Sequence, residues 1–208
     1  MEGAPPVTTV HRVDARHPDG PGLDAAAAVL EAGGTVAFPT ESFYGLGADA
    51  LDPEAVARVF RIKGRAESRP VLVLVDSVAR ALTLVAGAGT EVRALMARHW
   101  PGPLTLVLPA GPTVPPAITA GTGTVGVRVP GHPVTLALLR AAGRALTGTS
   151  ANRSGEPPPS CADEVARQLP GLVDVILDGG PTAGGAGSTV ADCTVWPPRI
   201  LRQGPVRL

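Results

Sequence analysis

Residues 34–64 decide the fold class, and they run GTVAFPTESFYGLGADALDPEAVARVFRIKG. The stretch begins with a short apolar β run, Thr35–Phe38, which a proline stops. It ends with a helix whose start is marked by Asp52, a good N-cap, followed by Pro and Glu. Gly64 closes that helix as a left-handed C-cap would. A strand, a polar loop and a capped helix in this order are typical of the α/β class.

The same alternation continues on both sides of this stretch. An earlier helix is expected from Asp24 through the alanine run to Gly33 and Gly34, which can supply its C-cap. Further strands are predicted at Val71–Val75, Leu104–Leu108, Thr124–Val129, Ala145–Thr147, Val173–Leu177, Thr189–Val195 and Arg199–Arg202. Further helices are predicted at Asp76–Val85, Thr90–Trp100, Pro133–Ala142 and Ser160–Leu169. This pattern predicts a single α/β domain with a twisted, mixed β-sheet of roughly six to eight strands, flanked by helices.

The domain is expected to occupy residues 23–208, and no linker divides it. Residues 1–22 are rich in Pro, Gly and His and predict a loose N-terminal arm or one short edge strand. At 208 residues and 44% hydrophobic content, the chain can bury the core of one sizeable domain. Its 26 glycines and 23 prolines fall between the apolar segments, as loops do, so the composition does not indicate disorder.

Charge and cysteine content narrow the classes of function. The formal net charge is zero, so a nucleic-acid contact would need a local basic patch. Cys161 and Cys193 lie far apart, form no CxxC motif and follow no secretory signal, which predicts the reduced environment of the cytoplasm. The four histidines show no metal-ligand spacing, so we expect no structural metal. No apolar run approaches the ~18–20 residues of a membrane span.

Two glycine-rich stretches have the letters of phosphate-binding loops. Residues 121–126 (GTGTVG) match the dinucleotide fingerprint, but a strand follows where the fingerprint needs a helix. A turn that enters this strand is therefore the better interpretation. Residues 179–189 (GGPTAGGAGST) lack the lysine of the nucleotide P-loop and also run into a strand. They form either a mobile loop or a loop that closes over a ligand.

The only lysine of the chain, Lys63, stands among arginines. Lysine is a compact point charge and arginine a planar fork, so the two are not interchangeable. Lys63 belongs to one of four segments rich in polar residues. All four are expected at strand ends or in the loops beyond them, where an α/β sheet positions its ligands. They are Pro39–Gly47, Lys63–Arg65, Thr149–Gly155 and Ser188–Val190. Each alone also has a structural explanation, as a tight turn or as cations that complement a helix dipole.

Together, these segments predict a site for an anion. Lys and Arg cations beside Ser and Asn donors suit phosphate, carboxylate or bicarbonate. No placed general base accompanies them. This favours a reaction driven by positioning and electrostatics, as nucleotidyl transfer is.

Eight stretches of the chain occur in the order in which one known family has them. They are Gly34–Gly47, Lys63–Arg65, Trp100–Thr105, Val127–Pro130, Thr149–Gly155, Leu177–Gly180, Ser188–Asp192 and Ile200–Gly204. On these motifs the chain resembles the YrdC-like family of threonylcarbamoyl-AMP synthases, over about residues 20–208. The sequence stops soon after the last motif, so the resemblance implies the short, stand-alone form of the family.

The resemblance implies a nucleotidyltransferase that makes threonylcarbamoyl-AMP and pyrophosphate from L-threonine, bicarbonate and ATP with Mg²⁺. A separate tRNA threonylcarbamoyl-transferase complex then modifies the adenosine next to the anticodon, so this complex and tRNA are expected partners, and a membrane is not. By the same resemblance, the catalytic residues are Lys63 and Arg65. The nucleotide-binding residues are Lys63, Ser150, Asn152, Arg128, Ser188 and Arg202. The residues that bind threonine or bicarbonate are Thr40, Arg65, Thr105 and Ser188.

The chain departs from the family pattern at a few positions. Phe43 stands where the family often has Val, and Ala66 where it often has Pro. We expect the bulkier Phe43 to reshape the amino-acid pocket. Two other functions stay open: a paralogue that adenylates a different carbamoyl acceptor, and a non-catalytic module that binds tRNA or double-stranded RNA. The zero net charge counts against the second, because affinity for the phosphate backbone grows with the number of phosphates neutralised.

Overall fold

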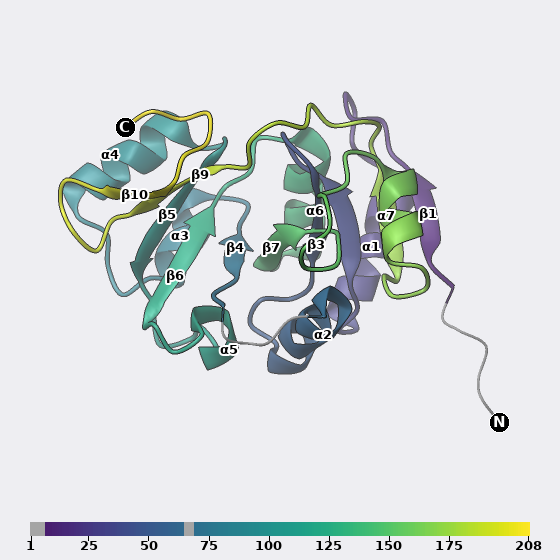
Figure 1. The fold of residues 1–208 in the computed structure, drawn as a ribbon, viewed down its shortest axis with the longest axis horizontal. Helices are drawn as coiled ribbons and strands as arrows, with labels where there is room; N and C mark the ends of the chain where they lie inside the picture. Colours follow the sequence, from purple (N-terminus) through teal and green to yellow (C-terminus); the bar gives the residue numbers. More distant parts are fainter. Residues whose placement is uncertain (1–6, 65–68) are drawn as a thin grey trace.

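Ten strands form one sheet in the part of the chain that the structure, a computed structural model, describes: residues 7–64 and 69–208. Their spatial order is β1-β8-β2-β3-β7-β4-β6-β5-β9-β10, which places β1 and β10 at opposite ends of the molecule (Figure 1). The strands are β1 (Thr9–Arg12), β2 (Val36–Pro39), β3 (Tyr44–Gly47), β4 (Leu72–Leu74), β5 (Leu104–Pro109), β6 (Thr124–Arg128), β7 (Leu146–Ser150), β8 (Val175–Asp178), β9 (Thr189–Asp192) and β10 (Arg199–Arg202). The helices are α1 (Pro21–Glu31), α2 (Pro53–Lys63), α3 (Val78–Thr83), α4 (Thr90–His99), α5 (Pro116–Thr119), α6 (Pro133–Ala142) and α7 (Ala162–Gln168).

The sheet is mixed, as predicted. Strands β1 and β2 both pair in parallel with β8, and the pairs β4–β6 and β5–β9 are also parallel. The other neighbours are antiparallel, including β3–β7 and β7–β4 in the middle of the sheet. We divide the sheet between β7 and β4. The strands on one side are called the β2 half (β1, β8, β2, β3 and β7), and those on the other side the β5 half (β4, β6, β5, β9 and β10).

Helices cover both faces of the β2 half because its strands are apolar on both sides. In β2, Val36 and Phe38 join the cluster that contains the apolar side chains of α1 and α6. Ala37, between them, joins the cluster that contains those of α2 and α7. All of β2 is buried, which is typical of a strand covered on two faces. In Figure 1, α7 lies in front of the strands and α1 lies behind them.

A separate apolar core belongs to the β5 half. It includes Met96 of α4 and Trp100, whose indole N–H donates to the carbonyl oxygen of Leu104 at 2.6 Å. Helix α2 contributes to this core as well, through Val56 and Phe60. Because other residues of α2 pack with the β2 half, this helix connects the two halves beneath the middle of the sheet.

The start and end of α2 are those that the sequence predicts. The Asp52 carboxylate accepts a hydrogen bond from the Glu54 backbone N–H at 2.9 Å, and Pro53 occupies the first turn. Gly64 ends the helix at φ 60°, in the left-handed region. Lys63 is therefore the last residue of the helix.

The expectation of roughly six to eight strands is too low. The short edge strand foreseen within residues 1–22 is present as β1. Strand β3, however, lies in a segment predicted as loop, because Gly45 and Gly47 disfavour strands. The Phe38 ring explains both glycines: a Cβ would lie 2.9 Å from the ring at Gly45 and 2.6 Å from it at Gly47. The strand forms because its glycines accommodate this ring.

Several predicted boundaries also move. Strand β7 continues to Ser150, because it pairs with β3 as well as with β4. Helix α1 has Gly20 and not Asp24 as its N-cap, since a proline occupies its first turn. Helices α3 and α7 are shorter than predicted, and α5 was not expected in its proline-rich loop. The turn interpretation of residues 121–126 is confirmed: Gly121 and Gly123 take φ of 75° and 70° directly before β6.

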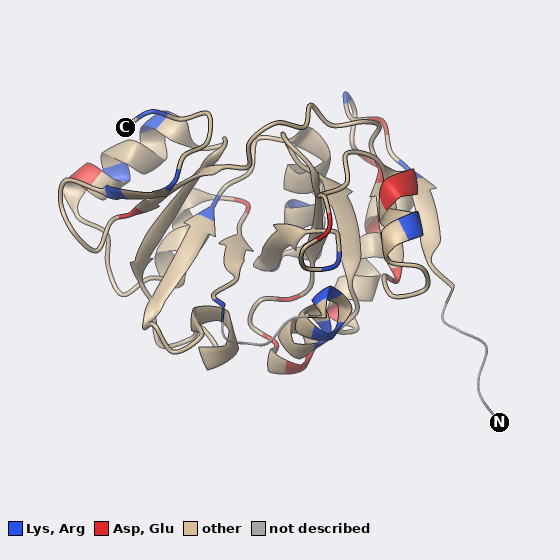
Figure 2. Cartoon of the chain, in the orientation of Figure 1, with Lys and Arg blue, Asp and Glu red and all other residues tan. Residues whose placement is uncertain are grey.

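Charged residues lie mainly on helices and loops and are rare on the strands, with both signs interspersed (Figure 2). This agrees with the zero net charge. No helix among residues 7–64 and 69–208 is long and apolar enough to cross a membrane.

Candidate active site

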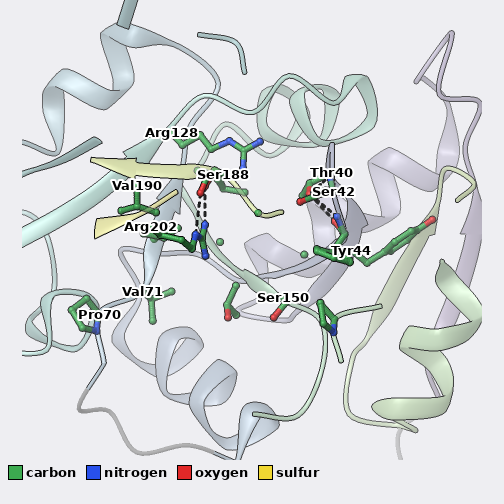
Figure 3. A pocket seen from close by; sticks show the side chains of 18 of the residues that line it. Thr40, Ser42, Tyr44, Pro70, Val71, Arg128, Ser150, Ser188, Val190 and Arg202 are labelled. Atoms are coloured by element: carbon green, nitrogen blue, oxygen red, sulfur yellow. Dashed lines mark hydrogen bonds between the residues drawn. The ribbon is translucent and has the colours of Figure 1, made fainter. Parts of the chain in front are cut away.

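The cavity that contains most of the predicted site residues, called the main cavity below, is about 530 Å³ in volume and opens where the two halves of the sheet meet. A cavity of about 600 Å³ beside α1 and α6 contains none of them. In the main cavity, the β2 half contributes the β2–β3 turn and the end of β7, and the β5 half contributes β4, the end of β6 and the segments around β9 and β10. The polar residues that line it are Thr40, Ser42, Thr149, Ser150, Arg128, Ser188 and Arg202. Figure 3 shows that hydroxyl groups of Thr40, Ser42 and Ser150 lie on one side and the two arginines on the other.

Arg128 and Arg202 flank Ser188 (Figure 3). The Arg202 guanidinium donates from Nε to the Ser188 carbonyl oxygen and from a terminal nitrogen to Ser188 Oγ, each at 3.0 Å. Burial, together with the charge of Arg128, lowers the pKa of Arg202. Two cations held so close that one perturbs the other make this side of the cavity suitable for an anion.

Thr105 reaches the site only through Ser188. Its side chain is fully buried, and its hydroxyl lies 2.9 Å from Ser188 Oγ. The substrate contact predicted for Thr105 stays a prediction, and in this structure its hydroxyl contacts Ser188. This contact fixes the Ser188 hydroxyl from behind.

Lys63 is 3% exposed and lies beneath the end of β7. Its ammonium group donates to the Ser150 carbonyl oxygen and, at 2.8 Å, to Asn152 Oδ1. The Ser154 backbone N–H in turn donates to the Lys63 carbonyl oxygen at 2.9 Å. The structure thus brings Lys63 together with Ser150 and Asn152, which follow it by almost ninety residues in the sequence. Of these three residues, only Ser150 lines the cavity. Arg65, the other predicted catalytic residue, and Ala66 lie outside the described residues.

Thr40 holds the β2–β3 turn. Its hydroxyl donates to the Phe43 carbonyl oxygen at 2.6 Å, and the Phe43 backbone N–H points back at Thr40 Oγ1 at 3.4 Å. The Ser42 backbone N–H also points at Thr40 Oγ1 at 3.4 Å, so the two lone pairs of this oxygen already face two long backbone contacts. Phe43 lines the main cavity and also a neighbouring cavity of about 410 Å³, whose wall includes Pro157 and Pro158.

Glu41 is the polar residue of this turn to which sequence reasoning assigned no role. Its carboxylate forms an ion pair with Arg128 and accepts a hydrogen bond from the Gly131 backbone N–H at 2.7 Å. Burial alone would raise the pKa of Glu41, but the Arg128 guanidinium outweighs it and holds the pKa below its ordinary value. No local pattern signals this contact, since its partners lie about ninety residues away in the sequence.

The glycine-rich stretch is anchored to its surroundings. The Tyr44 hydroxyl donates to the Gly180 carbonyl oxygen at 2.8 Å, and the Gly184 backbone N–H donates to the Ser42 carbonyl oxygen, also at 2.8 Å. Burial and the nearby Asp178 carboxylate raise the pKa of Tyr44, so its hydroxyl stays protonated and acts as a donor. Gly187 and Ser188, at the end of the stretch, line the main cavity.

Within residues 7–64 and 69–208, no cluster of three or more His, Cys, Asp or Glu side chains is placed to hold a metal ion. The polar groups that line the main cavity include two guanidinium groups and several hydroxyls.

Known proteins share this sequence and fold. Residues 28–204 match the Sua5/YciO/YrdC family, whose description is "Telomere recombination". A threonylcarbamoyl-AMP synthase of Pyrococcus abyssi is 45% identical over 183 residues, which cover 88% of this chain and 54% of that protein. A protein of the same name from Bacillus subtilis is 43% identical over 187 residues, covering 89% and 54%. The chain thus spans about half the length of these two relatives.

A solved structure shows the same architecture. P. abyssi Sua5 complexed with L-threonine superposes with a TM-score of 0.89 at 42% identity, over 94% of this chain and 57% of that one. The predicted single-domain α/β fold with a mixed sheet is confirmed by this match.

Proposed function

We propose, since this chain belongs to the Sua5/YciO/YrdC family, that it is an L-threonylcarbamoyladenylate synthase. It would convert L-threonine, bicarbonate and ATP into threonylcarbamoyl-AMP and pyrophosphate. A tRNA threonylcarbamoyl-transferase complex would then use this product to modify the adenosine next to the anticodon. Work on tRNA would place the enzyme in the cytoplasm.

The observation that carries the proposal is the composition of the main cavity. It holds two guanidinium groups on one side and hydroxyls on the other, in a volume of about 530 Å³. This volume falls in the usual range of small-molecule sites, about 300–1,000 Å³. Guanidinium groups suit phosphate oxygens in particular, because their N–H donors match the spacing of two such oxygens.

The chemistry of the product defines what the site must do. Threonylcarbamoyl-AMP is a mixed anhydride. The threonine amine must first bond to the carbon of bicarbonate with loss of water, and an oxygen of the resulting carbamate must then bond to the α-phosphorus of ATP while the bond to pyrophosphate breaks. Negative charge then accumulates on the departing pyrophosphate and on the α-phosphoryl oxygens. Fixed cations aimed at these oxygens lower the barrier without any proton transfer by the protein.

We assign the residues to this reaction as follows. Arg128, Ser188 and Arg202 would bind the phosphates, and Ser150 would contact the nucleotide from the opposite side. Lys63 and Asn152 hold the Ser150 segment from behind, and through this segment Lys63 would act on the reacting groups, together with Arg65. Thr40 and Arg65 would bind threonine or bicarbonate, with Thr105 acting through Ser188. Mg²⁺ would enter with ATP as part of the substrate, and we assign no protein ligand to it.

Phe43 favours a second candidate, a paralogue that adenylates another amino acid. This ring lies where the main cavity meets its neighbour, so it sets the space for a side chain bound there. We also retain residues 23–208 as the proposed catalytic domain and residues 1–22 as an N-terminal arm, whose β1 pairs with β8 at the edge of the sheet and whose last two residues begin α1.

The test is pyrophosphate release by the purified protein with ATP, Mg²⁺, bicarbonate and each amino acid in turn. Release that requires both L-threonine and bicarbonate supports the synthase. Release with a different amino acid supports the paralogue. No release, combined with salt-sensitive binding of tRNA, contradicts both and favours the RNA-binding module.

A further inference from the structure

The Glu41 carboxylate uses both of its oxygens on residues of the other half of the sheet. One oxygen accepts the Gly131 backbone N–H at 2.7 Å, and the other accepts from the Arg128 guanidinium. Glu41 itself lies in the β2–β3 turn and lines a smaller cavity, of about 330 Å³, beside the main one. Its side chain therefore crosses from one side of the site to the other.

Arg128 is held at two points. Besides the ion pair, its Nε donates to the Gly102 carbonyl oxygen at 2.9 Å, and the Gly102 backbone N–H donates to the Val129 carbonyl oxygen at 2.9 Å. Together with the bond from Gly131 to Glu41, these contacts close a ring around the guanidinium. The Arg128 side chain is 8% exposed, so this ring lies largely out of water.

The ring leaves part of the guanidinium available. Arginine has five N–H donors. Among the described residues, Glu41 and Gly102 accept from two of the five in Arg128. The remaining three belong to a side chain that lines both the main cavity and its smaller neighbour.

An anchor is needed here because Arg128 faces a like charge. Arg202 is fixed by its two bonds to Ser188, on the opposite side of that residue from Arg128 (Figure 3). The charge of Arg128 contributes to the lowered pKa of Arg202, which is the signature of repulsion between the two. A free Arg128 side chain would turn away from Arg202. The Glu41 carboxylate opposes this movement.

Glu41 is poorly suited to move protons. Both of its oxygens are already bonded, and its pKa is held below the ordinary value, which weakens it as a base. If Glu41 instead kept anions out by its negative charge, removal of that charge would tighten anion binding. If Glu41 positions Arg128, removal of the charge would weaken it. The two roles can therefore be separated by the sign of one measurement.

We propose that Glu41 is a positioning residue, which holds the Arg128 guanidinium beside Arg202 so that the two cations together bind a phosphate-type anion. The repulsion between the two guanidinium groups is overcome during folding, so it does not reduce the free energy of ligand binding. The inference rests on the proposed function only for the identity of the anion, a phosphate group of ATP or pyrophosphate.

The experiment is a double-mutant cycle with inorganic pyrophosphate as the probe, measured by calorimetry on the full chain. The variants are Glu41→Gln, Arg128→Gln and the double variant, with Glu91→Gln as the control. Glu91 is exposed on α4 and lines neither cavity, so this control removes the same charge elsewhere. Melting temperatures are recorded in parallel, and Glu41→Asp is included because it keeps the charge but is too short for both contacts.

We expect Glu41→Gln to weaken pyrophosphate binding about tenfold, Glu41→Asp to weaken it severalfold, and Glu91→Gln to leave it unchanged. The double variant should bind no more weakly than Arg128→Gln alone, because Glu41 acts through Arg128. Unchanged or tighter binding in Glu41→Gln or Glu41→Asp, additive effects in the cycle, or no pyrophosphate binding by the wild type would each overturn the inference. The proposed function is tested separately by threonine-dependent pyrophosphate release, so the two can fail independently.

Discussion

Lys63 occupies a site that suits a lysine and not an arginine. Its ammonium group is almost fully buried and lies against the Ser150 carbonyl oxygen and the Asn152 side-chain oxygen. A compact charge with donors in three directions can satisfy acceptors on different sides. A planar guanidinium is larger and sends its donors into one plane, so it does not fit the same space.

The first prediction compares two cations of α2. Lys63→Ala removes the partner of two acceptors that position the cavity wall, so we expect pyrophosphate release to fall at least about a hundredfold. Stability should also fall, by about 1–3 kcal/mol for each buried acceptor left unpaired. Arg61→Ala is the matched control, because Arg61 is exposed two residues earlier, and it should stay within about twofold of the wild type. Equal, small effects of the two substitutions would contradict the assignment.

Lys63→Arg is the stricter variant. It keeps the charge and changes only the shape of the cation, and we expect a loss of turnover close to that of Lys63→Ala. Full activity in the same assay would mean that any cation suffices at this position.

The second prediction concerns Phe43. Phe43→Val should open the main cavity toward the space beside Pro157 and Pro158. We expect kcat/KM for amino acids bulkier than threonine to rise about tenfold relative to threonine, the usual effect of a few methylene groups in a pocket. The measurement is pyrophosphate release across a series of amino acids. An unchanged order of preference would show that Phe43 does not touch the amino acid.

At the residue scale, the sequence predicts the members of the site better than their arrangement. The motif around Ser150 and Asn152 could be connected to Lys63 because the family pattern groups them. That Lys63 supports the wall from behind, and that Thr105 acts through Ser188, depends on burial. Burial is a property of the packed chain and is not written in any local pattern.

At the element scale, β3 shows how a strand can depend on one partner side chain. Its glycines are required by the Phe38 ring, which a Cβ at Gly47 would approach to 2.6 Å. The third prediction is that Gly47→Ala lowers the free energy of unfolding by about 1–3 kcal/mol, the typical cost of overpacking a core. Gly87→Ala is the control, because a Cβ there meets nothing within 4 Å. Urea denaturation measures both, and equal stability of the two variants would contradict this explanation of β3.

Helices α2 and α6 could be predicted more closely than strand β7. Helix α2 has a cap and a proline at its start and a glycine at its end, all readable in the sequence, and α6 occupies the predicted residues 133–142. Strands depend on partners elsewhere in the chain. The prediction ended β7 at Thr147 because the segment that follows is polar, whereas pairing with β3 carries the strand on to Ser150.

At the scale of the whole molecule, the ion pair between Glu41 and Arg128 connects the two halves of the sheet. The lowered pKa of Glu41 links this contact to pH. A carboxylate with a lowered folded-state pKa contributes stability above its unfolded-state pKa, close to 4.5, and loses it as the pH falls through the lower folded-state value.

The fourth prediction follows from this linkage. At neutral pH, Glu41→Gln should be less stable than the wild type by about 3 kcal/mol, because it leaves a buried arginine unpaired. As the pH falls below 4.5, the difference should shrink, because the Glu41 carboxylate of the unfolded wild type takes up its proton there, whereas that of the folded protein does so only at a lower pH. Urea denaturation of both proteins and of Glu91→Gln over this range provides the measurement. A difference that does not depend on pH would contradict the assigned role of the ion pair.

The position of the cavity means that a bound ligand links the two halves of the sheet. The core of the β5 half and the core of the β2 half, which consists of two clusters, meet at the β7–β4 pair, and helix α2 packs with both halves. The cavity opens at this junction. A ligand that contacts Arg202 on one side and Ser150 on the other spans the junction as a crosslink would. Occupancy therefore couples the melting of one core to that of the other, besides adding about 2.7 kcal/mol at a hundredfold excess over Kd. The empty protein should unfold over a broader range of temperature than the loaded one.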